Sequence, residues 1–375
     1  VGNLTGTVAT ATQNSITTMT GLTAAGATGT ATSVAGIPFF SDISNNSIYT
    51  HDVSGTDSTA EGNTAYGIGA LDAVTTGDYN TAIGFGALSA QQAGEGSVAI
   101  GQAALNANLA SNNLAVGKSA MIANTTGTRN IAIGNRALDL QDTENDNLAI
   151  GYEAMTTDNA GGTKNVALGN YALDALTSGD DNTALGYNAM TSATTGSNNT
   201  VVGKDAAAGA TITGSNNTAI GKDAMSALTT GGNNVSVGNS ALIAITTGTE
   251  NVAIGFEAMR LVTTASSNVA IGNEAMENNV AANNVAVGTK SMRANTTGTR
   301  NIAIGTNALD ATLTTGGNIA IGTGAGGLKT AGSDCVYIGT SSGAAATTSD
   351  NNTAVGTLTL EDATTGGGNS AFGAN

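Results

Sequence analysis

The sequence predicts an all-β protein, a parallel β-solenoid (β-roll) of about 19 to 20 coils with a 17-residue period. The phrase Asn-Ile-Ala-Ile-Gly at 130–134 returns, lightly varied, from Asn63 to the C-terminus. The closing glycines lie 16 to 18 residues apart, which is typical of one turn of chain stacked on the last. These glycines are Gly67, Gly84, Gly101, Gly117, Gly134, Gly151, Gly169, Gly186, Gly203, Gly221, Gly238, Gly255, Gly272, Gly288, Gly305, Gly322, Gly339, Gly356 and Gly373.

The composition limits both the core and the partners. Aromatic residues make up only 3% of the chain, so the core is expected to be one coil wide and built from Ala, Val, Ile, Leu and Met. The net charge of −16 and only eleven Lys and Arg argue against nucleic-acid binding. No apolar run reaches the roughly 18 residues of a membrane helix, so no membrane insertion is expected. Cys335 is the single cysteine and cannot form a disulfide within one chain.

Two domains are predicted. Residues 1–45 lack the period and are rich in Thr, Ala and Gly, and we expect an attachment or junction segment. Within it, residues 13–23 alternate like a strand, and residues 37–40 hold the only proline. An exposed solenoid end needs a cap, which these residues would provide. Residues 46–375 form the repeat shaft, whose first, degenerate coil is expected at Asn46 to Thr50, with Thr50 in the glycine place.

Each coil contains a short strand before its closing glycine. Ile131 and Ile133 flank Ala132, and the same columns of mostly β-branched residues flank alanine in most coils. Because strand side chains alternate, the two β-branched columns share one face. Such residues suit a buried pleated face, so we assign that face to the interior and the alanine column to the exterior. The alanine methyl groups would then suit close approach of another backbone.

A second segment, x-x-Ala-Leu/Met, follows the glycine. Its last column holds seven of the eight methionines, as at Met155 and Met190. Because methionine packs adaptably, we predict a core column; a metal-binding methionine array is the less favoured alternative.

The coil often closes through Thr-Thr-Gly, as at 125–127, where glycine can accept a positive φ. Coils of unusual length, such as 101–117 and 151–169, change only between the Leu/Met column and the next asparagine. That asparagine column is predicted to stack as an amide ladder, each side chain bonding its copies above and below. Ser97 and Cys335 interrupt it.

Candidate chemistry is sparse, and no catalytic, cofactor-binding or metal-binding residue is predicted. A Ser-His-Asp or Cys-His arrangement would need His51, the only histidine, for which a surface or capping role is favoured. The protein is therefore not expected to be an enzyme. Asp142, Glu144 and Asp146 could hold Ca²⁺, but a solvated acidic turn is favoured, because the glycine-rich calcium repeat is missing. Residues 322–327 suggest a phosphate loop only superficially; we predict one coil with Gly326 in the Leu/Met column.

The phrase Asn-x-Ala-Ile-Gly, as at 251–255, resembles the head repeats of trimeric autotransporter adhesins, which form left-handed parallel β-rolls in threes. The longer form with Ala-Leu and Thr-Thr-Gly looks more like the repeat shafts of phage tail fibres, and residues 13–23 are similar to segments of such fibres. The coil is longer than the usual adhesin-head repeat, and the sequence pattern contains neither a membrane anchor nor a long coiled-coil stalk of the adhesin kind. The identical stretches 123–134 and 294–305 indicate growth by duplication.

The resemblance implies a structural fibre or spike shaft of a virus, such as a phage tail fibre, that projects a receptor-binding or attachment region toward the host. The expected location is the virion, the N-terminal segment would bind baseplate or tail proteins, and a host-surface receptor is a further possible partner. The alternatives are a trimeric adhesin on the bacterial cell surface and an ice-binding solenoid. Ice binding needs a flat Thr-x-Thr strand, whereas these threonines are adjacent and lie at a turn.

We also predict a parallel homotrimer, either intertwined or side by side. A coil of about 17 residues has a core one side chain deep and leaves much apolar surface uncovered. The alanine columns, as at Ala82, Ala99 and Ala149, would meet the other copies around the axis. At roughly 4.8 Å for each stacked coil, the rod is expected to be on the order of 90 Å long.

Overall fold

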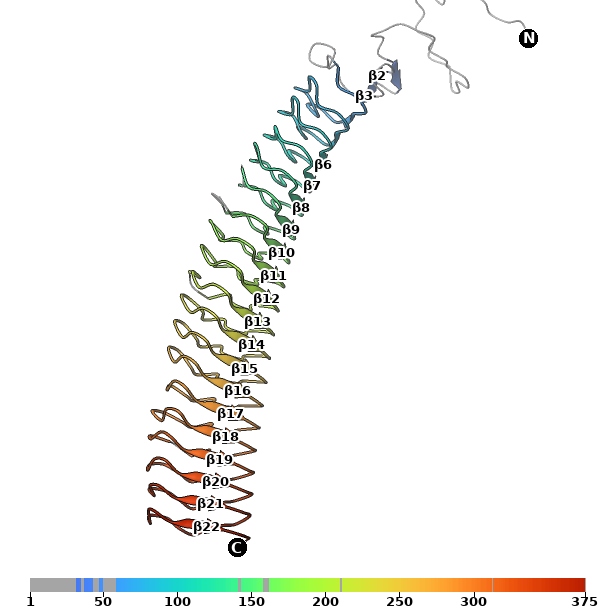
Figure 1. The fold of residues 1–375 in the computed structure, drawn as a ribbon. Helices are drawn as coiled ribbons and strands as arrows, with labels where there is room; N and C mark the ends of the chain where they lie inside the picture. The colour runs from blue at the N-terminus through green and yellow to red at the C-terminus, as the bar shows by residue number, and fades with distance from the viewer. Residues whose placement is uncertain are drawn as a thin grey trace, which may run out of the picture.

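The computed structural model describes residues 32–34, 37–42, 47–49, 59–140, 143–157, 162–209, 211–311 and 313–374. The expectations for residues 13–23, His51 and Asp142 therefore lie outside the described residues. At the N-terminal end, β1 (Thr32–Val34) pairs antiparallel with β2 (Ile37–Asp42), and β2 pairs antiparallel with β3 (Ser47–Tyr49). Figure 1 shows these strands at one end of a long, gently curved stack of coils.

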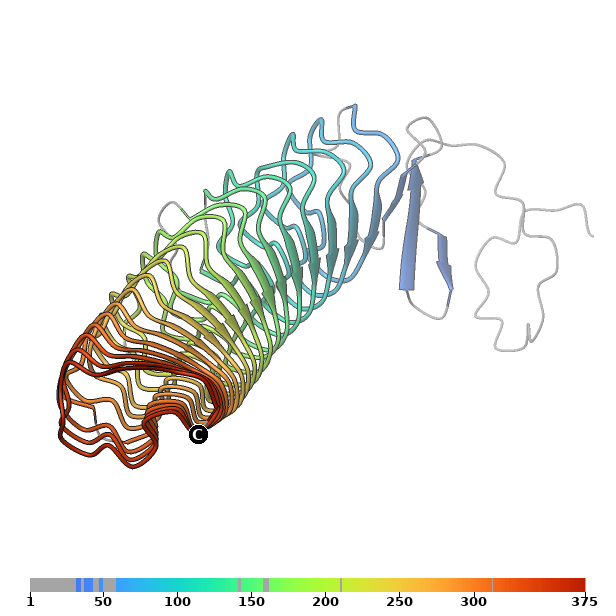
Figure 2. The ribbon, with the colours of Figure 1, turned by 60° about the horizontal axis from the view of Figure 1, so that its bottom comes forward.

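From β3 onward, the described strands form one parallel sheet of 20 strands, which confirms the predicted β-solenoid. Each strand pairs in register with the same position of the next coil, as Ala132 pairs with Ala149. The repeat strands are β4 (Thr64–Tyr66), β5 (Thr81–Ile83), β6 (Val98–Ile100), β7 (Leu114–Val116), β8 (Ile131–Ile133), β9 (Leu148–Ile150), β10 (Val166–Leu168), β11 (Thr183–Leu185), β12 (Thr200–Val202), β13 (Thr218–Ile220), β14 (Val235–Val237), β15 (Val252–Ile254), β16 (Val269–Ile271), β17 (Val285–Val287), β18 (Ile302–Ile304), β19 (Ile319–Ile321), β20 (Val336–Ile338), β21 (Thr353–Val355) and β22 (Ser370–Phe372). Figure 2 shows the strands following one side of the coils.

The predicted orientation of the strand faces is wrong. Ala132 is fully buried, whereas Ile131 on the same strand is 36% exposed, and the same pattern recurs along the sheet. The alanine column therefore lines the interior, and the β-branched columns lie outside. The reason is the narrow coil, because the Leu/Met column fills the space opposite the strand and leaves room for only a methyl group.

The Leu/Met column is a core column, as predicted. Leu88 and Met155 are fully buried, and both have a left-handed backbone, with φ of 49° and 56°. A left-handed conformation costs an ordinary residue roughly 1 to 2 kcal/mol, so burial of the side chain must offset this strain. The closing glycine before each such segment is required more strictly. At Gly84, where φ is +131°, a Cβ would lie 2.5 Å from the carbonyl oxygen of Gly101.

The glycine of the Thr-Thr-Gly turn is needed for a different reason from the one predicted. The φ of Gly127 lies outside the left-handed range, so this turn does not use the positive φ that glycine can accept. A Cβ at Gly127 would instead lie 2.3 Å from the carbonyl oxygen of Glu144 in the next coil. Close stacking of successive turns therefore selects glycine here.

The asparagine column forms a buried ladder, with one refinement. The Oδ1 of Asn63 accepts the backbone N–H of Asn80 at 2.8 Å, while Asn80 Nδ2 donates to the carbonyl of Gly94 in the next turn at 2.9 Å. The principal bonds thus run from amide to backbone, and amide–amide bonds such as Asn182 Nδ2 to Asn165 Oδ1, 3.1 Å, are added in some coils. Asn80, like most of the ladder asparagines, thus joins its own coil to the next one twice, since its Oδ1 accepts the backbone N–H of Ser97.

The first coil begins one residue later than predicted. Ser47, rather than Asn46, takes the asparagine place, and its Oγ accepts the backbone N–H of Asn63 at 3.0 Å. In the same register Tyr49 pairs with Ala65, so Tyr49 occupies the alanine column and is buried. The degenerate sequence concealed this register, because a tyrosine stands where alanine is the rule.

The shortened coils keep their strands, as predicted, and carry their own internal link. Between Gly101 and Gly117, buried Asn108 donates to the carbonyl of Ala110 at 2.7 Å and to Gln91 Oε1 at 2.8 Å. The other 16-residue coil, from Gly272 to Gly288, has Asn279 donating to Ala281 O at 2.8 Å. In two coils of ordinary length, Asn124 and Asn295 donate in the same way to carbonyls three residues ahead, at 3.1 and 2.9 Å. The shorter coils therefore keep this link although the turn has lost a residue.

Candidate interaction surface

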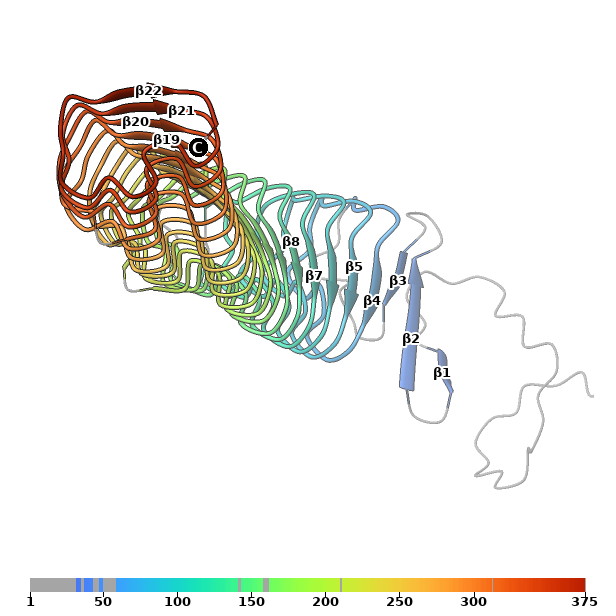
Figure 3. The same ribbon diagram turned by 90° about the horizontal axis from the view of Figure 1, so that it is seen from below.

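The outward face of the sheet is an uncharged strip, apolar except where threonine or serine begins a strand. We call it the outer strip, meaning the first and third residues of strands β4 to β22. Six of its isoleucines are half-buried to the same extent: Ile83, Ile100, Ile220, Ile254, Ile271 and Ile304 are each 38% exposed. These coils therefore present a similar profile on their outer side, and Figure 3 shows the strands side by side along the stack.

No residue of the outer strip is charged, although charged residues make up 10% of the chain. With strands about 4.8 Å apart, nineteen strands make a strip about 90 Å long and one strand wide, roughly 900 Å² in area. Contiguous apolar patches on monomeric proteins rarely exceed a few hundred Å². The strip is therefore the candidate functional surface of the described chain.

Two columns of exposed side chains border the strip. The entry margin is the residue immediately before each ladder position, and the exit margin is the residue after each closing glycine. Glu250 and Phe256, for example, are the entry and exit margins of the coil that contains β15. The two margins lie at opposite ends of the strand.

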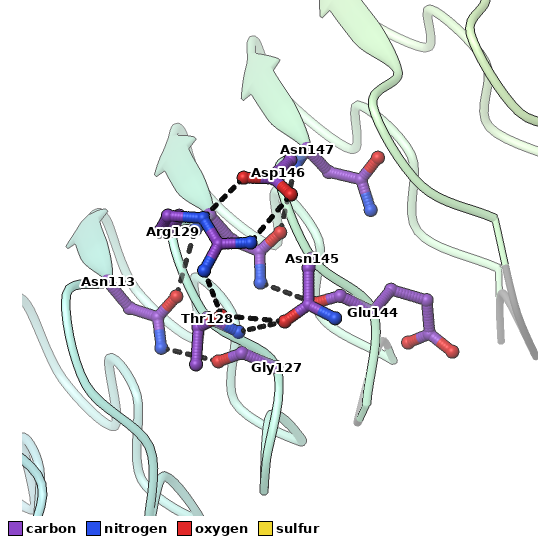
Figure 4. Close-up of polar contacts among 9 residues, drawn as sticks. Asn113, Gly127, Thr128, Arg129, Glu144, Asn145, Asp146 and Asn147 are labelled. Carbon is purple, nitrogen blue, oxygen red and sulfur yellow. Dashed lines mark hydrogen bonds and ion pairs between the residues drawn. The ribbon is translucent and has the colours of Figure 1, made fainter.

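The acidic turn considered as a calcium site ends at Asp146, an entry-margin residue. Arg129 donates from Nε and Nη2 to the two carboxylate oxygens of Asp146, at 2.6 and 2.8 Å, as Figure 4 shows. This hydrogen bond, together with the charge of Arg129, lowers the pKa of Asp146 and raises that of Arg129. Both groups are exposed to solvent, so the pair contributes little to stability.

The other described carboxylate of that turn, Glu144, does not converge with Asp146 on a shared site. Glu144 is buried, and its carboxylate accepts hydrogen bonds from the backbone and hydroxyl of Thr143, at 3.1 and 3.0 Å. Among the described residues, no group of three His, Cys, Asp or Glu side chains is arranged to hold a metal ion. The same part of the chain contains no helix long and apolar enough to cross a membrane.

The exit margin carries a small aromatic cluster in the middle of the rod. Tyr171, one residue beyond the margin, packs edge-on against Tyr152 and Tyr187, with ring centroids 5.5 and 5.9 Å apart. Lys204 Nζ lies 5.7 Å from the ring of Tyr187. A hydrogen bond to Glu153 raises the pKa of Tyr152.

Cys335 lies in a buried polar cluster inside the coils. Elsewhere the ladder asparagine donates to the carbonyl fourteen residues ahead, as Asn318 does to Gly332 at 3.3 Å. At Cys335 the equivalent acceptor is Ser349 O, and it receives Nζ of buried Lys329 at 2.7 Å. Lys329 thus replaces the missing amide, and its burial lowers its pKa. The sequence marked Cys335 as an interruption but did not reveal this substitute donor.

Around Tyr337 a large side chain stands where other coils have a small one, and small residues stand where other coils have large ones. Tyr337 occupies the alanine column and is fully buried, while Gly326 and Gly343 replace the Leu/Met residues of its own and the preceding coil. A Cβ at Gly343 would lie 2.3 Å from the ring of Tyr337. Residues 322–327 are therefore one solenoid coil with Gly326 in the Leu/Met column, as predicted. Burial raises the pKa of Tyr337, whose hydroxyl lies 3.1 Å from Ser349 Oγ.

No protein-family model matches the chain, and comparison with curated proteins gives no match.

Proposed function

We propose that this chain is the shaft of a homotrimeric fibre or spike, a structural part of a viral appendage such as a phage tail fibre. The observation that carries the proposal is the uncharged outer strip, which continues through every repeat strand. An apolar surface of this length in an acidic chain needs a cover, and a second copy of the same rod has the matching length and shape.

The contact face differs from the one expected from the sequence. The alanine columns lie inside the coil, so they are not available to another chain, and the outer strip takes their place. Sheets packed through their side chains lie about 10 Å apart, so three sheets would stand about 5 Å from a common axis. A triangle with that inner radius has sides of roughly 17 Å, which five or six extended residues span. A strand with its two margins comprises seven residues and spans roughly 20 Å, so the margins reach the corners of such a triangle.

The internal bonding supports a mechanical role. Each coil is joined to the next by the backbone ladder and the asparagine ladder, and by threonine hydroxyls such as Thr177, which donates to Thr194 O at 2.9 Å. Such stacking resists bending without a globular core. The end that carries β1 and β2 would attach to tail or baseplate proteins, and the far end would point toward a host receptor.

The fold fits the two alternative functions to different degrees. A trimeric adhesin on a bacterial surface would use the same shaft, so the architecture does not favour it over the viral fibre. Ice binding is disfavoured, because the first threonine of the turn uses its hydroxyl within the stack, as Thr246 does toward Thr263 O at 3.1 Å. Thermal hysteresis of the purified protein would reverse this preference.

The test is the mass and shape of the protein in solution. Light scattering after size exclusion should give three times the 36.3 kDa chain mass, and electron microscopy should show rods on the order of 90 Å or longer. A folded monomer at micromolar concentration would overturn the proposal.

A further inference from the structure

The two margins of the outer strip differ in charge. The exit margin contains no acidic residue in any coil, although the chain has 27 Asp and Glu. Its charged members are Lys118, Lys204 and Lys222, which are all exposed. The entry margin carries both signs: Arg129, Asp146, Lys164, Asp181, Glu250, Arg300 and Asp334. The strip is thus bordered by two chemically different edges.

The margins are matched coil by coil. The three lysines of the exit margin lie in coils whose entry margins are Asn112, Asn198 and Asn216. Conversely, the coils of Asp146 and Asp181 carry tyrosines at the exit margin, and those of Arg129 and Lys164 carry asparagines. Ten coils have a charged margin residue, and no coil has a charge at both margins. In nine of these ten coils, the residue at the opposite margin is Asn, Thr or Tyr. The exception is Phe256, opposite Glu250.

No contact within one chain accounts for this matching. The two margin residues of a coil are six residues apart along an extended strand, a span of roughly 20 Å, so their side chains do not meet. Contacts along one margin, such as Arg129 with Asp146, account for charges of opposite sign in successive coils. They do not relate the entry margin of a coil to its exit margin.

A parallel ring of three chains supplies the missing contact. Around a threefold axis the end of each strand meets the start of the neighbouring chain's strand, so an exit margin faces an entry margin. If the chains are in register, the facing margins belong to the same coil. Nine of the ten charged side chains then meet a neutral hydrogen-bonding group, and like charges are kept apart.

We propose that the exit margin of each chain packs against the entry margin of the next chain at the same coil, in a heterologous, parallel and in-register interface. This inference rests on the proposed trimer and specifies its contacts. The outer strip excludes water at the centre, and the two margins close each of the three seams. Amide and hydroxyl groups such as those of Asn198 and Tyr187 are the recognition elements for the facing Lys204 and Asp181.

The seam is testable by placing one cysteine on each margin of one coil. Asn283 and Thr289 are exposed, neutral margin residues of the β17 coil, and the native Cys335 is buried. We expect the variant N283C/T289C, treated with a short bismaleimide, to give covalent trimers on a denaturing gel. The single variants N283C and T289C should give none, because each presents only one margin. The mismatched variant N283C/T357C, whose cysteines are four coils apart, should also give none.

Each contrary result has a distinct meaning. Cross-linked dimers from a single variant would indicate a twofold contact and overturn the heterologous seam. Cross-linking of the mismatched pair would overturn the register. A double variant that keeps the trimer mass in solution but does not cross-link would refute the margin contact and leave the proposed shaft intact. A monomer mass for the unaltered chain would refute the shaft itself.

Discussion

A buried asparagine holds each coil to the next more firmly than any other single side chain in the repeat. Asn251 donates to Ala265 O at 2.9 Å and to Asn234 Oδ1 at 3.1 Å, and its own Oδ1 accepts the backbone N–H of Asn268 at 3.1 Å. All of these groups lie in the interior, where water cannot replace a lost partner. The ladder therefore stabilises the stack chiefly by avoiding unpaired buried backbone groups.

Replacing Asn251 by alanine should lower the free energy of unfolding by about 2 to 4 kcal/mol, because a buried N–H and a buried C=O each lose a partner. Asn278→Ala, outside the ladder and half-buried, is the matched control and should change stability by less than about 0.5 kcal/mol. Urea unfolding followed by circular dichroism measures both. Similar losses in the two variants would contradict the special role of the ladder.

Lys329 should make stability depend on pH. Burial lowers its pKa below the usual 10.5, so between the two values the unfolded chain binds the proton more strongly and stability rises with pH. Tyr337 has the opposite effect: burial raises its pKa above 10.0, so the unfolded chain loses that proton first and stability falls above pH about 10. The nearby Cys335 and Asp350 raise the pKa of Lys329 and oppose the effect of burial in part.

The variant Lys329→Met should remove the rise in stability between neutral pH and pH about 10 and keep the fall above it. Cys335 Sγ, 3.2 Å from Ser349 O, remains as a donor to that carbonyl in the variant. Urea midpoints measured at several pH values provide the comparison. Parallel pH profiles for the variant and the unaltered protein would show that Lys329 folds with an ordinary pKa.

At the level of the coil, the sequence pattern predicted which positions recur better than which way the strand side chains point. The period, the Leu/Met core and the asparagine column follow from which residue types recur, and these predictions are confirmed. Whether Ile131 and Ile133 face the interior or the outside could not be predicted from residue type, because β-branched residues suit a sheet whichever side is covered. Deciding it requires the width of the coil, which depends on the segment opposite the strand. The preference for Val and Ile outside is consistent with a cover supplied by another chain.

The surface could be identified in outline but not in detail. The sequence indicated that some repeat column must meet a partner, and it selected the alanines because their size suggested close approach. Burial of Ala82 and Ala99 excludes that choice. The exchange at Tyr337 left a usable signal, because the Leu/Met column changes to glycine twice, at Gly326 and Gly343, on either side of an alanine position occupied by tyrosine.

The compensating sizes of Tyr337 and Gly343 predict that substitutions at the two positions have strongly non-additive effects on the free energy of unfolding. Gly343→Leu alone should clash with the ring, and Tyr337→Ala alone should leave a cavity, each costing about 2 to 4 kcal/mol. The double variant restores the usual Ala and Leu pair of other coils and should lose less than the sum by about 1 to 3 kcal/mol. A double-mutant cycle from urea unfolding gives the coupling energy. Additive losses would mean that the two positions adjust independently.

For the whole molecule, the residues that fold one chain into a rod are different from those that would associate several rods. The interior is complete within one chain, since alanine, Leu/Met and asparagine columns fill and bond it. The outer strip contributes nothing to that interior, so its substitution should affect association before folding. The net charge of −16 on each chain opposes assembly at low salt, so the apolar strip has to outweigh mutual repulsion.

Charges placed on the strip should therefore separate the chains without unwinding the coils. The variant Ile254→Lys/Ile271→Lys/Val287→Lys puts three consecutive charges of each chain against their copies in a desolvated centre, where like charges cost several kcal/mol. We expect the mass in solution to fall toward 36.3 kDa while circular dichroism retains the strand signal. Ala253→Lys/Ala270→Lys/Ala286→Lys, one residue earlier in each strand, should instead abolish the fold, since those side chains point into the coil. If the strip variant kept the mass of the unaltered protein, the chains would have to meet through another face.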